Sequence, residues 1–182
     1  MSNEYLNGGK LMKTGNRVFL TVTAILMIGM LWVSGAYAWN ETHLQRLKAT
    51  KACPNCDLSG ADLSGAKLSG ADLSGANLYG ASMSGASMSG AKLEGANLTG
   101  ASMSGANLTS ANLSNANLSG ANLSGANLTS ANLSNANLYG ANLTSANLSN
   151  ANLGGANLSW AIWTDESRCG VGSIGMCKKC MI

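Results

Sequence analysis

Five cysteines are the residues of this chain best suited to chemistry: Cys53, Cys56, Cys169, Cys177 and Cys180. Two Cys-x-x-Cys spacings are typical of zinc sites, and such spacing also occurs in redox motifs with activated thiols. The two spacings lie at opposite ends of a long segment, so one ion cannot bind both. In an oxidising compartment disulfides are the better expectation. We therefore expect disulfides Cys53–Cys56 and Cys169–Cys177, with Cys180 free or intermolecular, and no metal or cofactor.

Acid–base catalysis has few candidate residues. Between residues 57 and 163 the chain has no histidine and four acidic residues: Asp57, Asp62, Asp72 and Glu94. We expect these carboxylates to point outward, away from any cleft that would shift their pKa values. The single histidine, His43, is expected to be a solvated helix residue. The sequence therefore predicts that the protein is not an enzyme.

The charge of the chain gives no reason to expect a nucleic acid partner. Charged residues make up only 10% of the sequence, and the formal net charge is +3. Three of the basic residues lie near the N-terminus, and from Trp39 onward eight basic residues face seven acidic ones. Such a near-neutral surface would not attract a polyanion.

The N-terminal segment has the pattern of a targeting signal. An uncharged, mostly aliphatic run from Val18 to Ala38 follows Lys10, Lys13 and Arg17, and it ends in the small-x-small pattern of residues 36–38. We interpret residues 1–38 as a signal peptide cleaved between Ala38 and Trp39. The alternative is an uncleaved membrane anchor. Both interpretations predict an extracytoplasmic protein, either periplasmic or secreted.

The rest of the chain is dominated by a five-residue repeat. Leu or Met recurs every five residues from Leu58 to Leu158, and Ala lies two places earlier from Ala61 to Ala161. A period of five fits neither an α-helix nor a long strand. Ala and Leu, two residues apart, would face inward together, and the Gly, Ser or Asn between repeats suits a tight corner. Four units would then close a coil of about 20 residues, and coils would stack at the strand spacing of about 4.8 Å.

This pattern resembles the pentapeptide-repeat family over residues 53–165. The resemblance implies an all-β fold, a right-handed quadrilateral β-helix. Residues 39–52 would form an N-terminal cap containing a short amphipathic helix with Leu44 and Leu47. Residues 166–182 would form a cysteine-containing tail, and Trp160, Ile162 and Trp163 would help to close the core.

The outer surface contains few residues that suggest a specific contact. Tyr79 and Tyr139 fall on one side, three coils apart, and are candidate partner contacts. Asp72 and Lys92 align in successive coils and are expected to form an exposed ion pair, whereas outward Asn side chains should bridge coils. Two threonines, Thr109 and Thr129, also align.

We therefore expect a non-catalytic exported scaffold or protein-interaction solenoid. Its partner would be an envelope or extracellular protein of unknown identity, and its oligomeric state is open. A membrane would be involved only if residues 1–38 stay attached. A glycan- or surface-binding module is the alternative, followed by a cysteine-based redox or metal protein.

Overall fold

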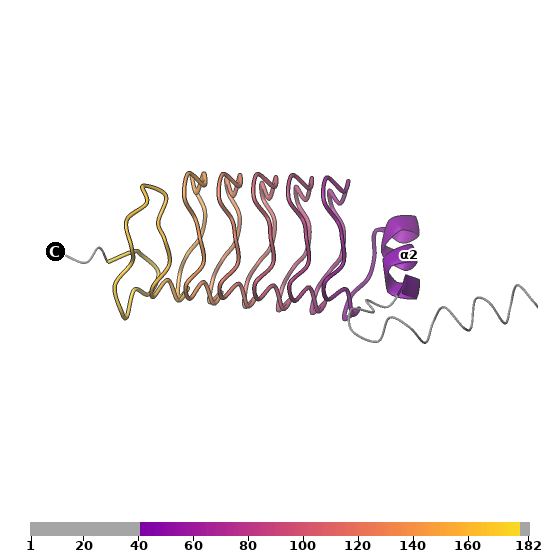
Figure 1. The fold of residues 1–182 in the computed structure, drawn as a ribbon, viewed down its shortest axis with the longest axis horizontal. Helices are drawn as coiled ribbons and strands as arrows, with labels where there is room; N and C mark the ends of the chain where they lie inside the picture. The colour runs from indigo at the N-terminus through magenta and orange to yellow at the C-terminus, as the bar shows by residue number, and fades with distance from the viewer. Residues whose placement is uncertain (1–40, 179–182) are drawn as a thin grey trace, which may run out of the picture. The chain divides into compact units, whose positions relative to one another are not determined.

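The computed structural model describes residues 41–178 of the 182-residue chain. Within that range the helix α2 (Glu41–Thr50) is followed by regularly spaced isolated β-bridges, the first at Ala52 and the last at Ile174. Successive coils stack into a column, with α2 beside the first coil and the C-terminal segment on the last (Figure 1). The described range contains no helix long and apolar enough to cross a membrane. The predicted signal peptide, the Ala38–Trp39 cleavage site and Cys180 lie outside the described residues.

Each coil contains 20 residues and has four sides. Parallel bridges join residues 20 apart, such as Asp62 to Ser82 and Ser82 to Ser102. We number the sides by the first coil: side 1 contains Cys53, side 2 Leu58, side 3 Leu63 and side 4 Leu68. Three backbone hydrogen bonds join such a repeat to the next coil: Leu63 N donates to Ser82 O at 2.7 Å, Gly65 N donates to Ser84 O at 2.9 Å, and Ser82 N donates to Ala61 O at 2.9 Å. The coil predicted from the five-residue period is confirmed.

The corners between sides are tight turns that need a positive φ angle. At the corner between sides 2 and 3 of the first coil, Ala61 N donates to Leu58 O at 3.0 Å, and Gly60 has a φ of 68°. Type II turns need a positive φ at their third residue, which is why Gly is favoured there. Later corners place Ser110 and Asn115 in the same conformation, with φ of 56° and 58°. The Gly, Ser or Asn of each repeat therefore sets the corner.

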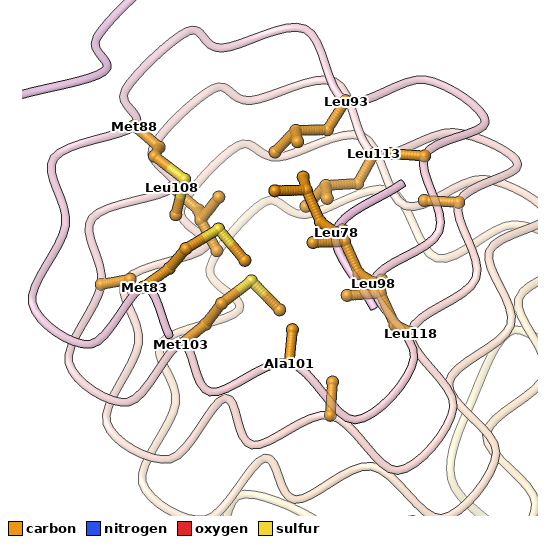
Figure 2. Packing of buried hydrophobic residues seen from close by; sticks show 14 of the residues in the cluster. Leu78, Met83, Met88, Leu93, Leu98, Ala101, Met103, Leu108, Leu113 and Leu118 are labelled. Carbon is orange, nitrogen blue, oxygen red and sulfur yellow. The ribbon is translucent and has the colours of Figure 1, made fainter. Parts of the chain in front are cut away.

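The interior of the column is filled by the Leu, Met and Ala side chains of the repeat. Met83 and Met103 lie one above the other on side 3, and Met88 and Leu108 do the same on side 4 (Figure 2). All four side chains are completely buried. Burying one such side chain contributes about 1.5–3 kcal/mol. The prediction that the central repeat residue points inward is confirmed.

The two ends of the core are covered by non-repetitive segments. At the start, Leu44 and Leu47 of α2 are buried in the same hydrophobic cluster as the first coil. At the other end the chain turns back, and antiparallel bridges join Asn157 to Ile174 and Ile162 to Arg168. The N-terminal end is thus covered by a helix, and the C-terminal end is covered by a segment that folds back in antiparallel bridges.

The prediction that Trp160 and Ile162 close the core was wrong. The five-residue period continues through this region, so Trp160 takes a corner position with a φ of 63° and is 41% exposed. Ile162 takes the outward position of its repeat, where it pairs with Asn142 of the coil below. Trp163 packs partly buried against the core cluster, which includes the completely buried Cys169.

Candidate interaction surface

Side 2 has a ladder of outward side chains in two hydrogen-bonded runs, from Asp57 to Asn97 and from Asn117 to Asn157. Asn77 Nδ2 donates to Asp57 Oδ1 at 3.0 Å, and Asn97 Nδ2 donates to Asn77 Oδ1 at 3.1 Å. Further along, Asn137 Nδ2 donates to the Oδ1 of Asn117 at 3.1 Å, and Asn157 continues the ladder at 3.3 Å. These bonds confirm that outward Asn side chains bridge coils, and they hold the surface of side 2 in one arrangement.

The two tyrosines lie directly beside this ladder. Asn77 Oδ1 also accepts a hydrogen bond from Tyr79 N at 3.3 Å, and Asn137 Oδ1 accepts one from Tyr139 N at 3.2 Å. Tyr79 is 59% exposed and Tyr139 is 50% exposed. They are three coils apart, which corresponds to about 14 Å at the usual strand spacing. Side 2 therefore presents two projecting aromatic rings on a backbone fixed by its own side chains.

The three aspartates of the first coils have lowered pKa values, chiefly because serines bond to them. For Asp57 the largest cause is the hydroxyl of Ser59, followed by the backbone N–H of Ser59. For Asp62 and Asp72 the largest cause is the backbone N–H of the serine two residues later, followed by its hydroxyl. Such carboxylates stay ionised near neutral pH and are weak general bases.

The predicted pairing of Asp72 with Lys92 takes a different form. The hydrogen bonds of the Asp72 carboxylate come from Ser74, whose N–H lies at 3.1 Å and whose hydroxyl lies at 2.8 Å from Oδ1. Lys92 lowers the pKa of Asp72 through its charge, as the smallest of the causes. Ser74 has the larger effect on the Asp72 carboxylate because it lies in the same turn, whereas Lys92 belongs to the next coil.

His43 lies in α2 as expected, but it also makes a specific contact with the first coil. Its side chain is half-buried, and its Nδ1 accepts a hydrogen bond from Asp57 N at 3.1 Å. His43 thereby satisfies a backbone donor at the free edge of the first coil. The sequence held one signal for this contact: His43 lies one turn before Leu47, on the buried face of α2.

The aligned threonines do not offer free hydroxyl groups. Thr109 Oγ1 donates to Asn107 Oδ1 at 2.7 Å, and Thr129 Oγ1 donates to Asn127 Oδ1 at 2.7 Å. Both threonines lie on side 4, but their hydroxyls are engaged within their own repeats. A regular hydroxyl array for glycans or a surface gains no support from this arrangement.

Four of the cysteines are paired within the described residues. Disulfides join Cys53 to Cys56 and Cys169 to Cys177, with Cα–Cα distances of 5.3 Å and 5.0 Å. The first spans the corner between sides 1 and 2, and the second closes the loop of the C-terminal segment. Within residues 41–178, no group of three or more His, Cys, Asp or Glu side chains could hold a metal ion.

The repeat and the coil are shared with known proteins. The family described as pentapeptide repeats matches residues 56–95, 86–125 and 121–159, in eight copies. No curated protein matches the chain significantly. Among solved structures, it is similar to a pentapeptide repeat protein (Rfr23) from the cyanobacterium Cyanothece 51142, with 34% identity and a TM-score of 0.63, over 68% of this chain and 98% of that one.

A second similar structure is a pentapeptide repeat protein from the thylakoid lumen of Arabidopsis thaliana. The identity is 36% and the TM-score 0.53, over 61% of this chain and 83% of that one. Together these neighbours imply that the 20-residue coil winds as a right-handed β-helix. On the repeat, the coil and the family match, this chain belongs to the pentapeptide repeat family.

Proposed function

We propose that this chain is a non-catalytic, extracytoplasmic interaction solenoid that binds another protein through side 2. The observation that carries the proposal is the pair of half-exposed tyrosines, Tyr79 and Tyr139, aligned beside the amide ladder. Tyrosine is enriched among the residues that dominate protein interfaces, because it offers a large apolar ring with a polar tip. The partner is an envelope or extracellular protein.

The rigidity of side 2 favours binding. Each tyrosine follows an Asn whose side chain bonds both to the tyrosine N–H and to a neighbouring coil. A surface already fixed before binding loses little backbone entropy when a partner arrives. Side 2 therefore serves as a preformed platform, whereas a disordered repeat would have to order itself on the partner.

A catalytic role lacks a suitable site in the repeat. The three aspartates have lowered pKa values and lie at the surface, bonded to serines of their own turns. Acid–base catalysis near neutral pH usually needs a carboxyl whose pKa is raised. Binding is thus the function that the exposed chemistry supports best. In this proposal α2 is the N-terminal cap that keeps the first coil covered.

The extracytoplasmic location rests on three observations. The apolar run that ends at Ala38 follows basic residues, the cysteines of residues 41–178 form disulfides, and a similar structure comes from a thylakoid lumen. Disulfides persist in oxidising compartments. The intact mass of the exported protein, alkylated before and after reduction, tests this directly. Loss of residues 1–38 with one free thiol is expected; a full-length mass with five free thiols would contradict it.

Site-specific photo-crosslinking tests the binding surface. A photoreactive phenylalanine derivative replaces Tyr79 or Tyr139 in the chain expressed in its host, and Thr129 on side 4 is the control position. We expect the same protein to be captured from both tyrosine positions and not from position 129. Capture that is equal at all three positions, or absent from both tyrosines, would contradict the proposal.

The double substitution of Tyr79→Ser and Tyr139→Ser gives the energetic test. Truncating an interface hot spot costs about 2 kcal/mol or more, which is roughly 30-fold in affinity for each tyrosine. The matched control is Thr129→Ser, which removes one methyl group from side 4. We expect the identified partner to lose affinity for the double variant only. Binding to glycans in place of a protein, with the same dependence on the tyrosines, would favour the glycan-binding alternative.

A further inference from the structure

The first coil is covered on only two of its sides. On sides 1 and 2, Ala52 N donates to Thr50 Oγ1 and Asp57 N donates to His43 Nδ1, both at 3.1 Å. On sides 3 and 4, the corresponding N–H groups of Asp62 and Lys67 bond to no other described residue. Helix α2 thus leaves half of this end as an open sheet edge, and such edges pair readily with another chain.

A groove of about 340 Å³ lies at this open half. Its apolar lining and its basic rim are formed by six side chains: Leu47, Leu63, Leu68, Lys48, Lys51 and Lys67. Ala66, which also lines it, is only half-buried, whereas Ala86 and Ala106 further along the same side are completely buried. The leucines of the groove are themselves buried, with Leu63 and Leu68 at 3% and 4% exposed, so Ala66 is the partly exposed apolar residue at its floor, surrounded by positive charge.

The last coil is also covered on two sides, but on a different two. Leu158 N on side 2 donates to Ser173 O at 2.7 Å, and Trp163 N on side 3 donates to Ser167 O at 2.7 Å. On sides 4 and 1, Leu148 N and Leu153 N bond to no other described residue, and both side chains are half-buried. The C-terminal segment itself exposes three apolar side chains: Val171, Ile174 and Met176, at 72%, 52% and 67%.

The two half-covered ends are complementary. Helix α2 covers sides 1 and 2 and leaves sides 3 and 4 open, whereas the C-terminal segment covers sides 2 and 3 and leaves sides 4 and 1 open. If a second copy stacks head to tail with a quarter turn, its α2 lies over open sides 4 and 1. The exposed C-terminal segment then lies in the open groove of that copy. Each end supplies the element that the other lacks.

The charges agree with the same register. In it, Lys67 on side 4 of one copy lies over side 3 of the other, where the turn after Trp163 contains Asp165 and Glu166, followed by the basic Arg168. The charged residues that line the groove are three lysines and one aspartate, Asp62, so the groove is basic. We propose that the N-terminal groove binds the C-terminal segment of a second copy, so that the solenoid associates head to tail. Because this contact joins two different surfaces, it leaves one groove and one segment free and can extend into longer rods.

Sedimentation velocity over a concentration series tests the contact, with the full chain in the form that its host exports. We expect the sedimentation coefficient to rise with concentration. Two single variants change exposed residues at opposite ends: Lys67→Glu in the groove rim and Val171→Glu in the C-terminal segment. Each is expected to weaken self-association at least about ten-fold, the effect of a single unfavourable contact of about 1.4 kcal/mol.

Mixing the two variants distinguishes head-to-tail association from any symmetric dimer. Val171→Glu keeps an intact groove, and Lys67→Glu keeps an intact C-terminal segment, so the mixture should form a one-to-one dimer that grows no further. Tyr139→Ser, which belongs to side 2, should associate like the unchanged chain, which separates this contact from the proposed partner surface. A monomer at every concentration, loss of association in only one of the variants, or no dimer in the mixture would overturn the proposal.

Discussion

The middle coils and the end coils contain the same repeat, yet their surroundings differ. In the middle, Leu113 is completely buried, its N–H donates to Asn132 O at 2.7 Å, and Asn112 N donates to Ala91 O at 2.9 Å. At the C-terminal end, Leu153 follows the same Ala-Asn pair but is half-buried, and its N–H bonds to no other described residue. The stability of a repeat therefore comes from its neighbours as much as from its own residues, as expected for a one-dimensional array.

The largest effect is expected from a charge placed in the middle of the core. Leu113→Asp would bury a carboxylate with no partner, and such a group costs several kcal/mol or more. We expect the middle coils to unfold, with loss of the cooperative melting transition followed by circular dichroism. Asn112→Asp, one residue earlier and facing outward, is the control and should melt like the unchanged chain. An unchanged melting curve for Leu113→Asp would show that this side chain does not point inward.

A milder pair of substitutions compares the middle with the end. Leu113→Ala should destabilise the protein by about 2–5 kcal/mol, because it leaves a cavity closed on all sides. Leu153→Ala removes the same atoms from a half-buried place, so its cost should be clearly smaller. Urea denaturation of both variants measures the difference. Equal costs would mean that the end coil is as well covered as the middle.

Much of this fold could be predicted from the sequence because the repeat is local information. The period from Leu58 to Leu158 fixes the coil and the inward residues, and the Gly, Ser or Asn of each corner fixes the turn. The contacts of the ends could not be predicted in the same way. The bond from Asp57 to His43 and the exposure of Trp160 depend on how non-repeating segments fold back.

The position of the candidate surface could be predicted from the sequence, but the hydrogen bonds that hold it could not. The placement of Tyr79 and Tyr139 on one side follows from their separation by a multiple of 20 residues. The bonds of Asn77 and Asn137 to the tyrosine N–H groups needed the turn geometry. The open sides of the two end coils had no sequence signal, since every repeat there looks complete.

Gly75, a corner glycine stacked on Asn55 of the neighbouring coil, should be less tolerant of substitution than the corner glycine Gly85. Gly75 and Gly85 share a φ of 65°, but a Cβ at Gly75 would meet Asn55 Oδ1, whereas a Cβ at Gly85 would meet nothing within 4 Å. Both Ala substitutions should cost about 1–2 kcal/mol for the left-handed conformation. Thermal melts should show a somewhat larger loss for Gly75→Ala, because Asn55 must move. The added substitution Asn55→Gly should remove the excess; an excess that persists would exclude Asn55 as its cause.

The smallest effect concerns pH and should be confined to the N-terminal end. The lowered pKa values belong to Asp57, Asp62 and Asp72, all in the first two coils, whereas the later coils have no acidic residue in this position. A lowered pKa stabilises the fold above the ordinary value of 3.8, and this contribution is lost as pH falls through the lowered value. We expect a small drop in melting temperature between pH 5 and pH 3. Replacing all three aspartates by Asn should flatten this dependence, and an undiminished dependence would assign it to other groups.

Hydrogen exchange of the full chain, resolved by residue, tests the difference between middle and ends most directly. Amides of coils that are hydrogen-bonded to a neighbouring coil above and below should exchange slowest. Protection should therefore be greatest around Asn112 and Leu113 and should fall toward both ends. Within the first coil, Ala52 and Asp57 should be better protected than Asp62 and Lys67, whose N–H groups lie on the open sides. This pattern is measured at a concentration where the chain is monomeric. Uniform protection along the column, or faster exchange in the middle than at the ends, would contradict the account.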